Sequence, residues 1–99
     1  MNTCIVIPAY NEEKTINKVV ESCILPGQVL VINDGSTDKT KSIARAAGAE
    51  VFSNVVRKGY DISLIKGIKK ALELKQDFII TIDADNQHPI SSIPTFLNY

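Results

Sequence analysis

Four short apolar runs are spaced along the chain, and longer amphipathic segments separate them. Three of the runs are rich in β-branched residues and cover positions 4–7, 29–32 and 78–82, and a weaker one covers 50–53. Their apolar residues are nearly continuous rather than alternating with polar ones. This pattern predicts strands of a parallel sheet that is covered on both faces.

The segments between the runs carry apolar residues at intervals of three and four positions, which predicts amphipathic helices. The expected inward-facing residues are Ile16, Val19, Val20 and Cys23, then Thr40, Ile43, Ala44 and Ala47, then Leu64, Ile68, Ala71 and Leu72. Ser36 or Thr37 is expected to cap the second helix, and Gly48 to end it. A short additional helix is predicted after Pro89.

Strands that alternate with helices predict an α/β fold. We expect a Rossmann-like, doubly wound, mainly parallel sheet of about four strands with helices on both faces, and residues 1–99 forming a single domain. Ligands of such sheets bind beyond the carboxyl ends of the strands. Three polar segments follow predicted strands and fall at this edge: 8–13, 33–38 and 83–88.

Each polar segment alone has a structural explanation, since Asn, Asp, Gly and Ser favour turns and acidic residues suit the first turn of a helix. The presence of all three at one edge favours a ligand site instead. No glycine-rich dinucleotide or P-loop motif is present. Glu12 and Glu13 would repel a pyrophosphate at the first strand–helix turn, so this turn and Asp34 suit the base or ribose of a nucleotide.

The third segment crowds Asp83 and Asp85 together after a buried strand, and a divalent cation would relieve their repulsion. Mg²⁺ and Mn²⁺ prefer oxygen ligands, which Asp85 and the Gln87 amide supply. Asp83 suits either the ribose or the metal. For His88 two interpretations stay open: contact with phosphate or metal-bound water, and a hydrogen bond within the turn.

Charge and composition limit the classes of partner and the compartments that we expect for this protein. The 99 residues contain 11 basic and 11 acidic side chains, and this zero net charge argues against nucleic-acid binding. Cys4 and Cys23 lie in apolar patterns, which predicts buried thiols in a reducing, cytoplasmic protein. The apolar runs are too short for a transmembrane segment, and no signal peptide is expected.

Three segments resemble, in order and spacing, the N-terminal half of family 2 glycosyltransferases with the GT-A fold: "CIVIPAYNEE" (4–13), "VINDGSTDKT" (31–40) and "IDADNQHP" (82–89). The subgroup most similar to them transfers sugars to dolichyl or polyprenyl phosphate. The resemblance implies inverting, metal-dependent transfer of a sugar from a UDP- or GDP-sugar donor. It implies a lipid phosphate or a glycan as the acceptor. It also implies that the full-length protein acts at the cytoplasmic face of a membrane.

The resemblance also assigns residues to the nucleotide sugar: Pro8, Ala9, Tyr10, Asn11, Glu12, Asp34, Lys58 and Asp83. It makes Asp83 and Asp85 the D-x-D pair and Gln87 a further ligand of Mg²⁺ or Mn²⁺. The family's N-x-G-K-G segment reads "NVVRKGYD" (54–61) here, with Arg57 at the first glycine position. A donor-side role and a solvated charge therefore both stay open for Arg57 and Lys58.

In the family, the half that follows the D-x-D pair supplies the acidic base that deprotonates an acceptor hydroxyl. We expect that half outside this chain, so no catalytic residue is assigned. The alternative function is a nucleotide-binding or dimerising module without turnover. An uncovered sheet edge would favour a homodimer.

Overall fold

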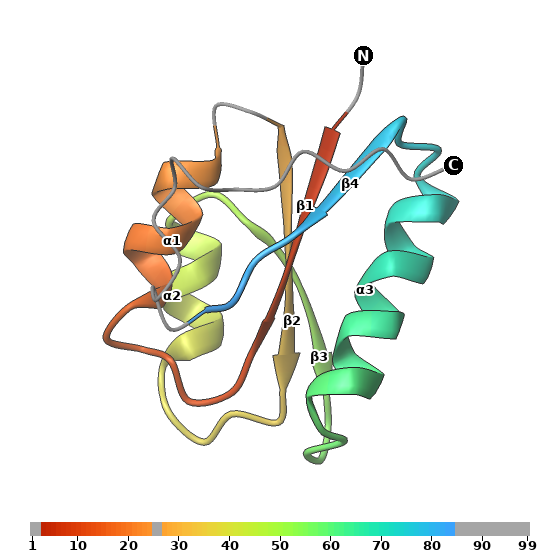
Figure 1. Cartoon of the computed structure of the whole chain (residues 1–99). Coiled ribbons are helices and arrows are strands. Elements are labelled where there is room, and N and C mark those ends of the chain that lie inside the picture. The colour runs from red at the N-terminus through yellow and green to blue at the C-terminus, as the bar shows by residue number, and fades with distance from the viewer. Residues whose placement is uncertain (1–2, 25–26, 85–99) are drawn as a thin grey trace.

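The computed structural model describes residues 3–24 and 27–84 (Figure 1). Strands and helices alternate along this part of the chain, as the sequence predicts. The elements are β1 (Thr3–Ala9), α1 (Ile16–Cys23), β2 (Gln28–Asp34), α2 (Thr40–Ala46), β3 (Glu50–Asn54), α3 (Tyr60–Glu73) and β4 (Phe78–Thr81).

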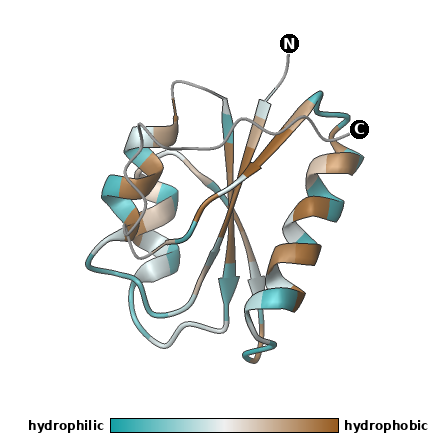
Figure 2. Cartoon of the chain, in the orientation of Figure 1, coloured by the Kyte–Doolittle hydropathy of each residue, from teal (hydrophilic) through white to brown (hydrophobic). Residues whose placement is uncertain are grey.

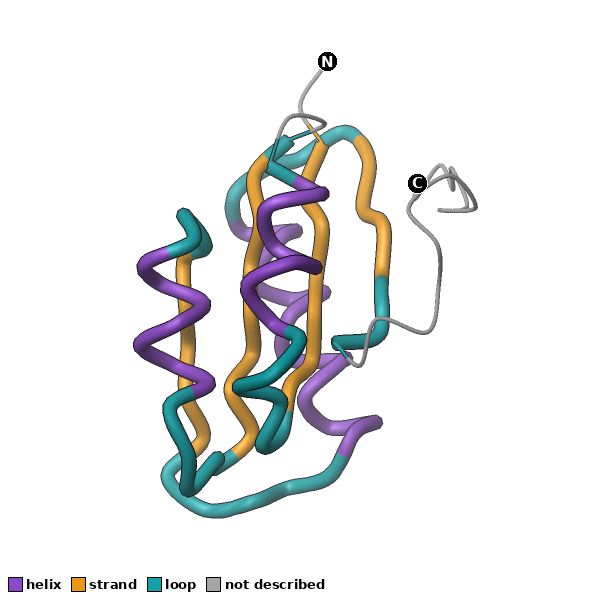
Figure 3. The backbone as a smooth tube through the Cα atoms, turned by 90° about the vertical axis from the view of Figure 1, so that its left-hand side faces the viewer, coloured by secondary structure: helices purple, strands orange, loops and turns teal. Residues whose placement is uncertain are grey.

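The strands form a four-stranded, parallel sheet in the order β3-β2-β1-β4. Helices α1 and α2 cover one face and α3 covers the other (Figures 1 and 3). The predicted fold class is therefore confirmed. Since all strands run in one direction, the loops that follow β1, β2 and β3 and the residues that follow β4 meet at the same edge.

The two faces of the sheet bury different residues of the same strands. Ile5 and Ile7 of β1 pack on the side of α1 and α2, whereas Cys4 and Val6 pack on the side of α3. The central strands are accordingly the most continuously hydrophobic part of the molecule (Figure 2). This double burial explains why the apolar runs do not alternate with polar residues.

Both cysteines are buried free thiols, as predicted. Burial, and secondarily the negative charge of Glu50, raises the pKa of Cys4 to about 11. Burial also raises the pKa of Cys23. No helix in the described part of the chain combines the length and the apolarity that crossing a bilayer requires.

Three details of the predicted helices differ from the structure or lie outside it. Leu72 is 57% exposed, because Leu64, Ile68 and Ala71 already fill the contact between α3 and the sheet. Neither Ser36 nor Thr37 caps α2, which begins at Thr40. The helix expected after position 89 lies outside the described residues.

Candidate functional site

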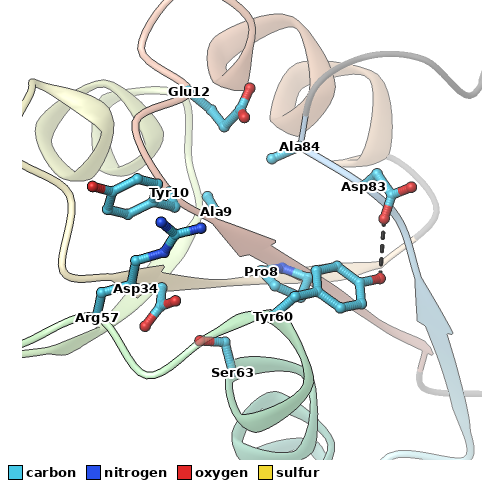
Figure 4. Close-up of a pocket in the computed structure, with 10 residues that line it drawn as sticks. All are labelled: Pro8, Ala9, Tyr10, Glu12, Asp34, Arg57, Tyr60, Ser63, Asp83 and Ala84. Carbon is cyan, nitrogen blue, oxygen red and sulfur yellow. Dashed lines mark hydrogen bonds between the residues drawn. The ribbon is translucent and has the colours of Figure 1, made fainter.

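A cavity of about 560 Å³ opens at the carboxyl ends of the strands (Figure 4). Its walls come from the carboxyl ends of β1 and β2, from the loops after β1 and β3, from the start of α3 and from the residues after β4. The lining residues are Pro8, Ala9, Tyr10, Glu12, Asp34, Arg57, Tyr60, Ser63, Asp83 and Ala84. The predicted ligand edge of the sheet thus coincides with a cavity.

Most of the residues predicted to contact a nucleotide sugar line this cavity, although their roles stay predictions. Asn11 and Lys58 are not among the lining residues. Asn11 instead connects two loops: its carboxamide oxygen accepts from the Thr37 N–H at 2.8 Å, and its own N–H donates to Ser36 Oγ at 2.9 Å. The predicted metal ligands Asp85 and Gln87, and also His88, lie outside the described residues.

Asp34, at the end of β2, is buried and holds the loop that precedes α3. Its carboxylate accepts hydrogen bonds from the backbone N–H of Lys58 at 2.7 Å and of Gly59 at 2.9 Å. The Asn54 amide donates a third, at 2.9 Å. Burial would raise the pKa of Asp34, but these bonds and one from Ser63 outweigh it, so the pKa lies below its ordinary value.

A second set of hydrogen bonds joins the loop after β1 to the loop after β2. The Glu12 N–H donates to the Thr40 hydroxyl at 2.8 Å, and the Glu13 N–H donates to Asp38 at 3.3 Å. Asp38 also accepts from the Thr40 N–H two residues further on, which is the hydrogen bond of an Asx turn. Burial raises the pKa of Asp38, but these hydrogen bonds outweigh it and lower the pKa below its ordinary value.

The residues after β4 are connected to both neighbouring helices. The Tyr60 hydroxyl, at the start of α3, donates to Asp83 Oδ1 at 3.0 Å (Figure 4). The Thr15 hydroxyl, beside α1, donates to the Ala84 carbonyl at 2.7 Å. The sequence-based prediction missed Thr15, Tyr60 and Ser63, because no spacing rule relates them to the acidic segments.

The cavity is predominantly acidic. Glu12, Asp34 and Asp83 contribute carboxylates, and Arg57 is the basic side chain among the described residues that line it. The guanidinium carbon of Arg57 lies 3.9 Å from the centroid of the Tyr10 ring. An acidic cavity with a flat stacked pair in its wall can hold a planar, hydrogen-bonding ligand together with a cation.

The comparison with protein families agrees with this fold and this site. Residues 4–99 match the family described as glycosyl transferase family 2, and the chain belongs to that family. The predicted family and its glycosyltransferase character are thus confirmed.

Among curated relatives, an uncharacterized protein of Methanocaldococcus jannaschii is 42% identical over 86 residues, which are 85% of this chain and 35% of that protein. A second relative is the UDP-N-acetylglucosamine–dolichyl-phosphate N-acetylglucosaminyltransferase of Methanococcus voltae. It is 35% identical over 103 residues, which cover 85% of this chain and 41% of the transferase. The chain therefore spans well under half the length of either relative.

Among solved structures, glucosyl-3-phosphoglycerate synthase from Mycobacterium tuberculosis in complex with UDP superimposes with a TM-score of 0.73. The two are 31% identical, and the match covers 89% of this chain and 35% of the synthase. Another structure of that synthase contains Mn²⁺, UDP-glucose and phosphoglyceric acid. Its TM-score is 0.69 at 30% identity, over 84% of this chain and 33% of the synthase.

Proposed function

We propose that this chain is the nucleotide-sugar-binding part of an inverting, metal-dependent glycosyltransferase that uses a UDP- or GDP-sugar donor. The observation that carries the proposal is the convergence of the three polar segments on one cavity, to which they contribute Tyr10, Asp34 and Asp83. The family membership and the likeness to a synthase crystallised with UDP support the same function.

A divalent cation fits the donor chemistry of this site. Asp83 contributes a carboxylate beside an already acidic cavity, and hard cations prefer carboxylate and amide oxygens. We assign Asp83, Asp85 and Gln87 to Mg²⁺ or Mn²⁺, which would neutralise the diphosphate leaving group. Structures of the similar synthase with Mn²⁺ or Mg²⁺ support this assignment.

The proposed acceptor is a lipid phosphate or a glycan. The relative from Methanococcus voltae, which is named as a dolichyl-phosphate N-acetylglucosaminyltransferase, supports the first of these. A phosphate acceptor is already ionised, so its oxygen attacks the sugar without a general base. A hydroxyl acceptor would need one, and we assign that role to no residue of this chain. Action at the cytoplasmic face of a membrane and homodimerisation through a sheet edge stay predictions, and sedimentation of the chain tests the second.

Calorimetric titration with UDP and with GDP, each with and without Mn²⁺, tests the proposal. We expect Mn²⁺ to tighten nucleotide binding in the wild-type chain and to have no such effect in Asp85→Ala. Glu21→Ala, which removes an exposed carboxylate from α1, is the matched control and should behave as the wild type. A nucleotide affinity that changes neither with Mn²⁺ nor with the Asp85 substitution would contradict the cation site.

A further inference from the structure

Arg57 occupies a defined position in the wall of the cavity. Its guanidinium carbon lies 3.9 Å from the centroid of the Tyr10 ring, which is the geometry of a cation–π stack. The two side chains come from different loops, after β3 and after β1, and meet beside the cavity (Figure 4). A solvated arginine would not require this arrangement.

The backbone of Arg57 is fixed from two directions. On one side, Asp34 accepts hydrogen bonds from the N–H groups of the next two residues, Lys58 and Gly59. On the other side, Gly35 packs so closely that a Cβ atom added there would lie 2.7 Å from the Arg57 nitrogen. Gly35 also has a φ of +71°, which favours glycine. The loop is therefore positioned by β2, and Arg57 with it.

The stack changes the surface that the cavity offers to a planar ligand. One face of the Tyr10 ring is covered by the guanidinium, so a ring that enters from that side meets Arg57 before it meets tyrosine. Nucleobases stack on guanidinium planes as well as on aromatic rings in protein–nucleic acid recognition, so both are known stacking surfaces. The nearby carboxylates of Asp34 and Glu12 can accept hydrogen bonds from the edge of a base or from a ribose.

We propose that Arg57 is the platform on which the nucleobase of the donor stacks, with Tyr10 supporting the guanidinium from behind. This inference rests on the proposed function, because it assumes that a nucleotide enters the cavity. Stacking tolerates any base, so the platform serves uracil and guanine alike. Selection between the two must then come from hydrogen bonds at the edge of the base.

A nucleoside without phosphates separates stacking from charge attraction. NMR titrations of the 99-residue chain with uridine, UDP and GDP in Mg²⁺ would be compared between the wild type, Arg57→Ala and Arg57→Lys. We expect Arg57→Ala to weaken binding of all three ligands by a similar factor of about tenfold, the value of one base stack. Arg57→Lys should behave like Arg57→Ala, because lysine keeps the charge but has no plane.

Arg45→Ala is the matched control, since it removes an exposed arginine from α2 and should leave every affinity unchanged. Weaker UDP binding by Arg57→Ala with unchanged uridine binding would make Arg57 a phosphate contact and overturn the platform. Unchanged affinities would overturn it too, as would a wild type that binds UDP but no uridine. If the wild type binds no nucleotide at all, the proposed function fails, and the platform with it.

Discussion

The hydroxyl of Tyr60 donates a hydrogen bond to the carboxylate of Asp83 at 3.0 Å, across 23 positions of sequence. Tyr60 begins α3 and Asp83 follows β4, so this bond joins the start of α3 to the residues after β4 in the wall of the cavity. Asp83 is the first acid of the predicted D-x-D pair, and we expect Tyr60 to orient its carboxylate.

Removal of this hydroxyl in Tyr60→Phe should weaken nucleotide binding. The variant keeps the ring but leaves the Asp83 carboxylate without one donor, and hydrogen bonds to charged groups contribute about 1.5–3 kcal/mol. We expect UDP or GDP affinity in Mn²⁺ to fall by about tenfold, measured by calorimetry, which corresponds to about 1.4 kcal/mol of binding free energy. Ser22→Ala, which loses an exposed hydroxyl from α1, is the control. Equal affinities for Tyr60→Phe and the wild type would exclude the orienting role.

Substitution of Asp34 by Asn should destabilise the fold in a pH-dependent way. Asparagine replaces one acceptor oxygen by an NH₂ group that faces backbone N–H donors, so we expect a loss of about 1–3 kcal/mol in the free energy of unfolding near neutral pH. The folded pKa of Asp34 lies below its ordinary 3.8, so the ionised carboxylate stabilises the fold above that value. This stabilisation disappears as the pH falls from 3.8 through the folded pKa.

Urea unfolding of the wild type and Asp34→Asn, at neutral and at acidic pH, measures this difference. The difference in free energy of unfolding between the wild type and Asp34→Asn should become smaller as the pH falls. Asp61→Asn, an exposed position of α3, should show no comparable gap. If the difference in free energy of unfolding stays constant with pH, the charge of the Asp34 carboxylate does not stabilise the loop before α3.

At Gly67, helix α3 lies directly against side chains of the sheet, and Gly67→Ala should destabilise the protein. A Cβ atom there would lie 2.2 Å from Val6 Cγ1 and 3.1 Å from Ile32 Cγ1, and both neighbours are fully buried. Overpacking of this kind costs about 1–3 kcal/mol, more than the better helix propensity of alanine returns. Thermal unfolding followed by circular dichroism measures the effect. Lys69→Ala, exposed on the same helix, should change stability by less than about 0.5 kcal/mol.

Both thiols should be inert in the folded protein. Cys4 and Cys23 are fully buried, and the raised pKa of Cys4, about 11, keeps it protonated at neutral pH. A thiol-specific reagent should therefore label neither residue at a measurable rate until denaturant unfolds the chain, after which both should react. Rapid labelling of the folded protein would show that α1 or β1 opens locally.

Much of the fold was predictable because its causes are local. Continuous apolar runs identify strands buried on both faces, and the structure places β2 at Gln28–Asp34, around the predicted 29–32. The start of α2 was not predictable in this way. The N–H groups of Ser36 and Thr37 bond to Asn33 and Asn11, so these residues belong to the junction of two loops and α2 starts later, at Thr40.

The site was partly predictable for a related reason. Parallel strands put Tyr10, Asp34 and Asp83 at one edge whatever the details of the loops, and the cavity contains all three. The partners of each group depend on contacts between distant segments. The bond from Thr15 to the Ala84 carbonyl spans 69 positions, and the sequence contains no periodic pattern that indicates it.

By itself, the sequence determined the order of strands and helices, the family and the edge of the sheet at which the cavity opens, because hydrophobic periodicity and motif spacing are properties of neighbouring residues. Only the tertiary structure decided what each polar group at that edge contacts. It directs the Asp34 oxygens to backbone N–H groups, Tyr60 to Asp83, and Arg57 onto the Tyr10 ring. These choices depend on how closely separate loops approach one another, and packing of the whole sheet sets those distances.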